Sequence, residues 1–339
     1  MSLIEKGRFQ QILAGFSKLK PILVVGDIGL DKYTFGEVKR ISPEAPVPVL
    51  EVSKEWMKLG LAANVTDNLQ SLGVQSTICG VAGEDKNASL LEDLLEEQGL
   101  KTWGVVRSSE RMTTFKERVT TNVQQICRVD YETKSEINKD VYNKVMNRLE
   151  DFYKEHSMLI IEDYGKGLIT EELCKTLINK FKEQGKMVAI DPSRTTPPKY
   201  YRGADLLKPN YLESQIIAET LGFRNVKDVN ELANILVDKL ELSKIVITLG
   251  GDGMALMDRS ANGKLKIIPT AATEVFDVSG AGDTAISAIS AALNAGATLE
   301  EAAWIGNCAS GVVVGKKGTA NVTQKELLAY YDRLAAQIK

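Results

Sequence analysis

Histidine is nearly absent from the sequence, which has one such residue, His156, among 339. Ser-His-Asp hydrolases, HExxH zinc enzymes and histidine proton shuttles all place imidazole at the reacting centre. His156 precedes the apolar run MLIIED (158–163). We interpret it as a polar residue at a helix end, because helix C-termini favour histidine. The sequence therefore argues against all three kinds of chemistry.

Cysteine is scarce and scattered, and no two cysteines have CxxC spacing. Neither a zinc knuckle nor a disulfide framework is indicated by such a pattern. We expect reduced, buried thiols at Cys79, Cys127, Cys174 and Cys308.

The sequence also lacks an excess of positive charge and a long apolar run. Its net charge is -3 and its pI is near 5.6, so no basic surface is predicted for nucleic acid or anionic lipid. No run approaches the roughly 20 apolar residues that span a bilayer. The first 20 residues carry charges within an apolar periodicity and predict a short amphipathic helix. We expect a cytoplasmic protein without nucleic acid or membrane partners.

Apolar residues (44%) and charged residues (26%) match an ordinary soluble domain. Short β-branched runs at 22–27, 76–83, 158–163, 187–191, 204–210 and 244–250 predict strands. Helical spacing fills 61–73, 88–99, 142–156, 171–185 and 229–242. This alternation favours an α/β fold with a mostly parallel sheet covered on both faces.

Two alternating segments, 31–54 and 113–132, are not followed directly by helices. We predict antiparallel strands that form a small β-sheet lid, inserted into a core of residues 1–30, 55–112 and 133–339. Pro43, Pro46 and Pro48 suit an edge or a turn. The lid would lie beside the strand ends where open α/β sheets bind ligands.

The run DVSGAGDT (277–284) leads into the small-residue helical pattern AISAISAALNAGA. A helix start offers unpaired N–H groups and a dipole that favour an anion. Gly280, Ala281 and Gly282 would let a phosphate approach the backbone. Asp283 then falls in the first turn, either facing the bound group or serving as an ordinary helix-capping acid.

Other phosphate motifs are missing. The sequence has no GxxxxGK[ST] and no His-Arg-Asp loop, and VVGDIGLD (24–31) is not GxGxxG. A nucleotide site in this chain must be of another kind.

DVSGAGDTAISAIS (277–290) resembles the second signature of the ribokinase family, also called the PfkB carbohydrate kinases, and the order of elements agrees from about residue 20 to 330. The resemblance implies a ribokinase-like three-layer αβα sandwich with a β-sheet lid. Residues 24–52 and 302–323 are most similar to the D-glycero-β-D-manno-heptose-7-phosphate kinases. These phosphorylate the anomeric hydroxyl of a phosphorylated heptose on the way to ADP-heptose for lipopolysaccharide.

The resemblance implies the site residues. Asp283 would take the proton of the sugar hydroxyl that attacks the γ-phosphate of ATP, and the amides of Gly280, Ala281 and Gly282 would stabilise the transferring group. Asn210 and Glu213 match the family's Asn-x-x-Glu, which helps hold Mg²⁺, through water at Glu213, and the ATP phosphates. The nucleotide would also contact Thr248, Gly250, Gly251, Gly253, Asn307, Ser310 and Gly311.

From the residues alone, other interpretations are equally possible. PNYLE (209–213) also predicts a strand end followed by a helix cap, and TLGGDGM (248–254) also predicts a tight hairpin turn. The small residues near 307–311 also predict a helix contact.

For the acceptor, Asp27 and Asp31 resemble the family's hydroxyl-binding acids, and Gly60 and Asn64 fall in its first signature. The acceptor's phosphate requires cations, supplied by Arg40, Lys116, Arg118, Arg128 and Lys166. A solvated charged strand face is the alternative for each of these cations.

Two departures bear on the acceptor. The family usually has Gly-Gly where this chain has Gly60-Leu61, and leucine resists positive φ. The heptose kinases tend to read Asp-Pro-Lys where this chain has Asp191-Pro192-Ser193-Arg194, so Arg194 would replace the cation. A PfkB kinase for another sugar, or a sensor without turnover, is therefore the alternative.

Family lids often pair across a dimer, and an apolar lid face of Tyr33, Phe35, Val47 and Val49 fits a homodimer or a cover over its own site. Many relatives carry a second nucleotidyltransferase domain with histidine motifs. With one histidine, we expect this chain to stop at the bisphosphate.

Overall fold

The computed structural model describes residues 3–150, 152–316 and 320–338, and its larger sheet runs in the order β13-β12-β11-β10-β9-β8-β1-β4-β5. The strands are β1 Ile22–Gly26, β4 Ser76–Gly83, β5 Val105–Ser108, β8 Met158–Glu162, β9 Met187–Asp191, β10 Leu206–Leu207, β11 Lys244–Thr248, β12 Met254–Asp258 and β13 Lys266–Ile268. Pairing is parallel from β5 to β11, and β12 and β13 are antiparallel. The predicted α/β class is confirmed, and TLGGDGM forms the turn between β11 and β12.

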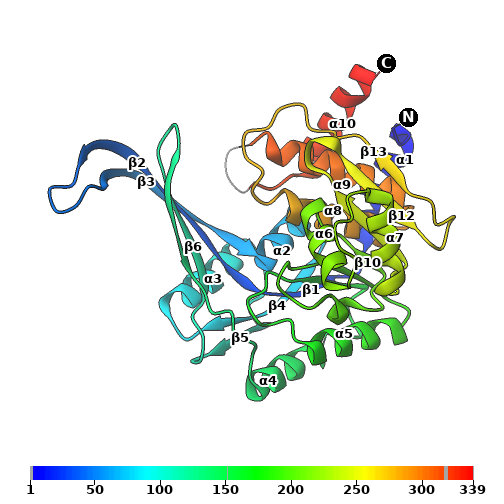
Figure 1. Ribbon diagram of the computed structural model, residues 1–339, viewed down its shortest axis with the longest axis horizontal. Helices are drawn as coiled ribbons and strands as arrows, with labels where there is room; N and C mark the ends of the chain where they lie inside the picture. The colour runs from blue at the N-terminus through cyan, green and yellow to red at the C-terminus, as the bar shows by residue number, and fades with distance from the viewer. Residues whose placement is uncertain (1–2, 151, 317–319, 339) are drawn as a thin grey trace.

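Helices cover both faces of this sheet (Figure 1). One face carries α1 Lys6–Gly15, α2 Ala62–Ser71, α3 Lys86–Glu97, α8 Ala281–Asn294, α9 Leu299–Val314 and α10 Gln324–Ile338. The other carries α4 Lys139–Glu150, α5 Glu171–Glu183, α6 Tyr211–Thr220 and α7 Val229–Lys239. Three layers result, as the sequence predicted.

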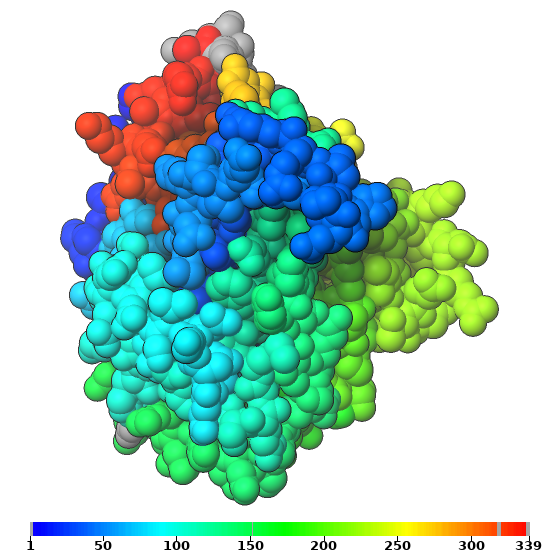
Figure 2. All heavy atoms as spheres, turned by 90° about the vertical axis from the view of Figure 1, so that its left-hand side faces the viewer, coloured from blue at the N-terminus to red at the C-terminus, as the bar shows by residue number. Residues whose placement is uncertain are grey.

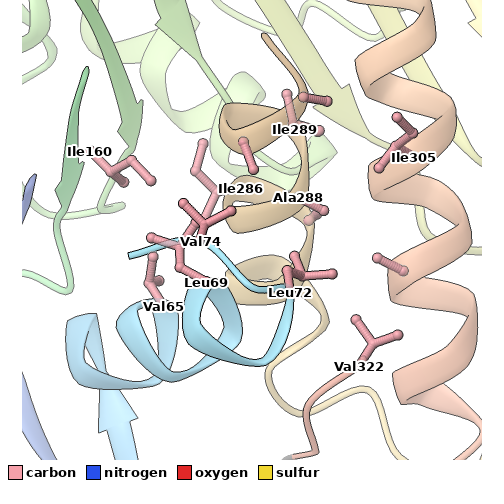
Figure 3. Packing of buried hydrophobic residues seen from close by; sticks show 14 of the residues in the cluster. Val65, Leu69, Leu72, Val74, Ile160, Ile286, Ala288, Ile289, Ile305 and Val322 are labelled. Atoms are coloured by element: carbon pink, nitrogen blue, oxygen red, sulfur yellow. The ribbon is translucent and has the colours of Figure 1, made fainter. Parts of the chain in front are cut away.

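The strands are buried on both sides because alternate side chains enter opposite cores. Val24 and Ile160 join the first core, whereas Val25 and Ile161 join the second. In the first core α2 and α8 pack side by side, with Val65 and Ile286 between them (Figure 3). The two helices that begin beside the candidate site are thereby fixed relative to each other.

The smaller sheet has the order β3-β2-β6-β7, with β2 Ile28–Ile41, β3 Pro48–Leu61, β6 Thr114–Thr120 and β7 Gln125–Tyr131. β2 and β3 reach into residues 28–30 and 55–61, beyond the expected lid bounds. Figure 1 shows their hairpin projecting from the body as an arm, and Figure 2 shows the blue arm across the face seen from that side.

Leu61 keeps the backbone conformation that a glycine would adopt. At the junction of β3 and α2 it has φ 59° and ψ -138°, and its side chain is buried. A non-glycine residue in this region costs on the order of 1–3 kcal/mol. The junction of β3 and α2 therefore uses a positive-φ residue, and leucine occupies it under strain.

The structure shows where the single histidine and the four cysteines lie. His156 is buried, and its ring nitrogens contact the Phe152 carbonyl and the Thr77 hydroxyl. It lies after the end of α4 and serves the core. Cys79, Cys174 and Cys308 are buried as expected, but Cys127 is exposed because it lies on the solvated lid strand β7. Within the described part of the chain, no helix combines the length and apolarity needed to cross a membrane.

Candidate active site

A cavity of about 810 Å³ opens at the carboxyl ends of the parallel strands. Segments that follow β8, β9, β10 and β11 line it, together with the start of α8. Open parallel sheets bind ligands at this edge. Its polar lining includes Glu162, Asp163, Tyr164, Lys166, Asp191, Arg194, Lys208, Asn210, Glu213, Thr248 and Asp283.

Asp283 lies in the first turn of α8, lines the cavity and does not cap its own helix. Its Oδ1 accepts a hydrogen bond from the Tyr164 hydroxyl and its Oδ2 accepts one from Asn64 Nδ2, each at 2.5 Å. Burial raises the pKa of Asp283, while these two hydrogen bonds and the charge of Lys208 lower it. The geometry is that of an oriented carboxylate facing a ligand space.

The backbone at the start of α8 offers a smaller amide cradle than expected. Gly280 is the N-cap, with φ 80°, which favours glycine. The N–H of Ala281 donates to the Val278 carbonyl at 3.2 Å, and that of Thr284 begins the helical ladder at the Gly280 carbonyl. The amides of Gly282 and Asp283 lack intrahelical partners because they open the helix. The amide of Ala281 is thus already engaged within the turn, and contact of a phosphoryl group with this turn stays a prediction.

A buried ion pair forms the floor beside this turn. Lys208, after β10, pairs with Asp191, at the end of β9, at 2.7 Å. A Cβ added to Gly282 would lie 3.7 Å from the Lys208 ammonium. Burial lowers the pKa of Lys208, but Asp191, Glu162 and Glu213 raise it more, so the net shift is upward. A cation thus stands next to the open amides.

The carboxylates around Lys208 differ from ordinary acids. Burial, with the charge of Asp191, raises the pKa of Glu162 well above its usual range, and no hydrogen bond to its Oε2 is found among the described residues. Burial raises the pKa of Asp191 to about 7 and that of Asp163 to about 6. Desolvation favours the protonated forms.

Four of the predicted nucleotide residues meet at the cavity: Asn210, Glu213, Thr248 and Gly250. Asn210 and Glu213 form a capping box that starts α6, and a bridge pairs Asn210 with Thr248. Gly250 and Gly253 have positive φ, and a Cβ at Gly253 would collide with the Ile268 carbonyl. Gly251 has open space around it and lies in the same turn.

The structure uses the three predicted residues of α9 differently. The side-chain amide of Asn307 bonds to the backbone: it donates to the Pro269 carbonyl and accepts from the Ala271 amide. Ser310 donates to the Ala281 carbonyl. Gly311 permits close contact with Tyr330 of α10. None of the three lines the cavity. Each contacts a neighbouring segment of the chain, and nucleotide binding by these residues stays a prediction.

The predicted hydroxyl-binding acids also have partners within the chain. Asp27 accepts hydrogen bonds from the backbone amides of Tyr164, Lys166 and Leu168, which fixes the loop after β8. Asp31 pairs with Arg118 at 2.6 Å. Gly60 lies opposite, where an added Cβ would be 3.1 Å from an Asp31 oxygen. Sugar binding by these acids stays a prediction.

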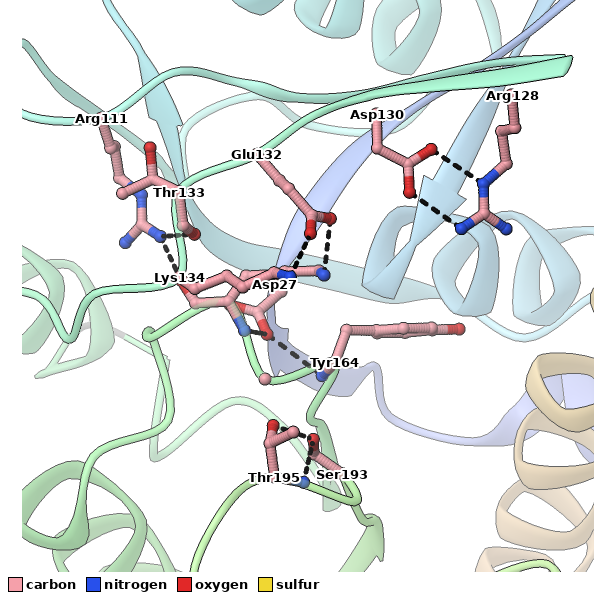
Figure 4. Close-up of polar contacts among 12 residues, drawn as sticks. Asp27, Arg111, Arg128, Asp130, Glu132, Thr133, Lys134, Tyr164, Ser193 and Thr195 are labelled. Atoms are coloured by element: carbon pink, nitrogen blue, oxygen red, sulfur yellow. Dashed lines mark hydrogen bonds and ion pairs between the residues drawn. The ribbon is translucent and has the colours of Figure 1, made fainter.

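Of the predicted phosphate cations, only Lys166 lines the cavity, and Figure 4 shows another, Arg128, paired with Asp130. Near the cavity, Lys166 pairs with Glu132 at 2.6 Å and Lys116 lies 5.4 Å over the Tyr164 ring. Arg128 is half exposed and held by Asp130. Arg40 is not brought to this group, because β2 advances about 30 Å between Asp31 and Arg40 along the projecting arm.

Glu213 suits a supporting role toward Mg²⁺ that is held mainly by phosphate oxygens and water. One of its oxygens accepts the Asn210 amide, and the other lies 3.4 Å from Arg194. Among the described residues, no group of three or more histidine, cysteine or acidic side chains is arranged to hold a metal. Magnesium commonly uses only one or two carboxylates plus substrate phosphates, so the residues fit.

Sequence reasoning missed Tyr164 and the Lys208–Asp191 pair. Tyr164 lies two residues before Lys166, Lys208 directly precedes PNYLE (209–213), and Asp191 begins the stretch Asp191-Pro192-Ser193-Arg194. A tyrosine or a lysine directly after a buried strand was the available signal. Their partners, however, come from distant segments that only the folded chain brings together.

Curated proteins similar to this chain include two named bifunctional protein HldE. That of Citrifermentans bemidjiense is 42% identical over 307 residues, covering 91% of this chain and 62% of the relative. That of Nitratiruptor sp. is 40% identical over 315 residues, covering 92% and 65%. The chain thus spans less than two thirds of the length of these relatives.

Solved structures with this fold include the ribokinase of Thermotoga maritima, with TM-score 0.74 at 20% identity, covering 93% of this chain and 100% of that chain. Phosphofructokinase-2 of Escherichia coli reaches 0.75 at 19% identity, covering 94% and 99%. These likenesses identify the fold as ribokinase-like. The pfkB family carbohydrate kinase model matches residues 27–326. The chain therefore belongs to the pfkB family of carbohydrate kinases.

Proposed function

We propose that this sugar kinase transfers the γ-phosphoryl group of ATP to the C1 hydroxyl of D-glycero-β-D-manno-heptose 7-phosphate, giving the 1,7-bisphosphate in the synthesis of ADP-heptose for lipopolysaccharide. The observation that carries the phosphoryl-transfer step is the Asp283 carboxylate on the cavity wall, beside the open amide of Gly282. The choice of heptose is supported by relatives named HldE at about 40% identity.

In this reaction the Asp283 carboxylate accepts the proton of the acceptor hydroxyl as its oxygen attacks the γ-phosphorus. The bond to the β-phosphate oxygen breaks, and ADP leaves. Charge spreads over the oxygens of the group in transfer. The amides of Gly282 and Asp283 and the ammonium of Lys208 stabilise this charge from two sides.

ATP is supported as the donor by the ribokinase of Arabidopsis thaliana complexed with ribose and ATP, which shares the fold. Its phosphates would lie between the turn of Thr248 and Gly250 and the start of α6. Mg²⁺ would neutralise phosphate charge near Glu213. Arg194 lines the same wall and would take the place of the lysine that heptose kinases tend to have.

The acceptor would lie between the lid and the loop after β8. Lys116, Arg118 and Lys166 approach this space from two sides, and arginine and lysine there suit the 7-phosphate. We also propose a homodimer through the lid, because the arm exposes Ile41, Val47 and Val52. Tyr33, which was expected on the apolar lid face, is buried instead. We propose a cytoplasmic location, because ATP is supplied there.

An acceptor panel tests the proposal. With Mg-ATP, the purified protein should phosphorylate heptose 7-phosphate with a higher kcat/KM than ribose, fructose 1-phosphate or adenosine. Comparable rates on several sugars would favour a pfkB kinase for another acceptor. Leu61 and Ser193, which depart from the family pattern, are the residues that suggest this alternative. Asp283→Asn should lower kcat by about 10²- to 10⁴-fold while ATP affinity persists. Unchanged turnover in this variant would refute the mechanism.

A further inference from the structure

Tyr164 is the aromatic residue of the loop that follows β8, and it contacts the candidate base directly. Its phenol donates to Oδ1 of Asp283 at 2.5 Å, while Asn64, on α2, donates to Oδ2 at the same distance. The carboxyl group is thus held between donors from two separate segments. Each carboxylate oxygen has two lone pairs, so the group can still accept the proton of a substrate hydroxyl.

The phenol also offsets the effect of burial on this carboxyl group. Burial raises the pKa of Asp283, and the Tyr164 hydrogen bond is the first of the contributions that lower it. A base must be ionised to accept a proton. Other charged groups that act on this carboxyl, or on which it acts, are Lys208 after β10, Asp31 on β2, Glu162 on β8 and Asp191 on β9.

Tyr164 is fixed by contacts on its other sides. Its backbone amide donates to Oδ2 of Asp27 at 3.1 Å. The ammonium of Lys116, on lid strand β6, lies 5.4 Å from the centre of its ring. A cation over a phenol ring withdraws electron density and strengthens the O–H as a donor. Contacts therefore run from the lid through Lys116 and Tyr164 to the base.

We propose that Tyr164 is a positioning residue that keeps Asp283 ionised and aimed at the acceptor, and that Lys116 couples this effect to the lid. The inference rests on the proposed role of Asp283 as the base. It adds a residue whose hydroxyl acts without touching the transferred phosphoryl group.

The test is Tyr164→Phe, which removes the hydroxyl and keeps the ring. Without the phenol, the pKa of Asp283 rises, so the acidic limb of kcat/KM moves to higher pH. The variant should lose severalfold more activity at the acidic end of the profile than on its plateau. Lys116→Met should move the limb in the same direction by less. Tyr331→Phe, which removes a phenol from α10 bonded to the Ile4 carbonyl, is the matched control and should leave the limb in place.

A uniform loss at every pH in Tyr164→Phe would overturn the proposal, since a merely structural tyrosine would act so. The pH profile can be measured with whichever sugar is turned over, so a different acceptor leaves the test intact. Carboxyl-¹³C NMR gives a readout without turnover. The resonance that disappears in Asp283→Asn should titrate at higher pH in Tyr164→Phe, and an unmoved titration would refute the role of the phenol even if no sugar is phosphorylated.

Discussion

The ammonium of Lys208 lies 2.7 Å from Oδ2 of Asp191, and the lysine side chain is almost fully removed from solvent. Two strand ends, β9 and β10, supply these partners. The pair stands beside Gly282, where a phosphoryl group would be transferred. This buried cation has a structural partner and, in the proposed reaction, lies beside the group in transfer.

Removing one partner of this pair should destabilise the protein more than removing both. Lys208→Met leaves Asp191 buried without its cation, which costs about 3–5 kcal/mol. The double variant Lys208→Met/Asp191→Asn should recover most of the free energy of unfolding, as measured by chemical denaturation. Additive losses in the double variant would contradict the pairing. The folded double variant should still have a reduced kcat, because the charge beside Gly282 is gone.

Gly282→Ala should separate catalysis from stability. An added Cβ meets no atom closer than 3.7 Å, and the residue lies in the first turn of α8, so alanine fits and the melting temperature should be unchanged or slightly higher. The methyl group would nevertheless enter the space before the open amides. We expect kcat to fall by about 10- to 100-fold, since small displacements of a reacting group are costly. Wild-type turnover in this variant would mean that phosphate does not approach there.

The free energy of unfolding should depend on pH through the titration of Asp163. Burial, with the nearby charge of Asp27, raises the pKa of Asp163 to about 6, above its value in the unfolded chain. The folded state then binds more protons between pH 4 and pH 6, so this group's contribution to stability falls as pH rises through that window. Asp163→Asn removes the dependence. The free energy of unfolding of the variant relative to wild type should increase by up to about 3 kcal/mol from pH 4 to pH 6, and a flat difference would contradict it.

Lys166 should serve the acceptor phosphate selectively. It lines the cavity and its charge is paired with Glu132. Lys166→Met should raise the KM for heptose 7-phosphate by about 10-fold or more, with little change in the KM for ATP, as expected for loss of a charged hydrogen bond. Arg40→Met, on the distant arm, should leave both constants unchanged. A raised acceptor KM in Arg40→Met would mean that a second copy brings its arm to the site.

The architecture was predictable because the parallel strands are buried on both faces and so read as short apolar runs. The core strands at Ile22–Gly26 and Met158–Glu162 are examples. The two-residue strand Leu206–Leu207 was expected to be longer, since apolar character in sequence does not reveal how far a partner strand extends.

Asp283 was predictable because its turn is a continuous signature in the sequence. Tyr164 was not, because its importance arises from a contact with a residue far along the chain. Asp27 and Asn307 show a different limit of the sequence. Their positions were recognised, but their polar atoms are already engaged by backbone groups of neighbouring loops. Sequence spacing does not show which hydrogen-bonding groups are consumed by the fold.

Leu61 joins the last strand of the lid to α2, the helix that also carries Asn64. Asn64 is one of the two donors to Asp283. Less than one helical turn therefore separates the end of β3 from a donor to the Asp283 carboxyl group, and a rotation of β3 at Leu61 would reach that carboxyl group through Asn64. If the acceptor sugar binds at the lid as proposed, we expect its contacts there to act on the proposed base through this short stretch of backbone.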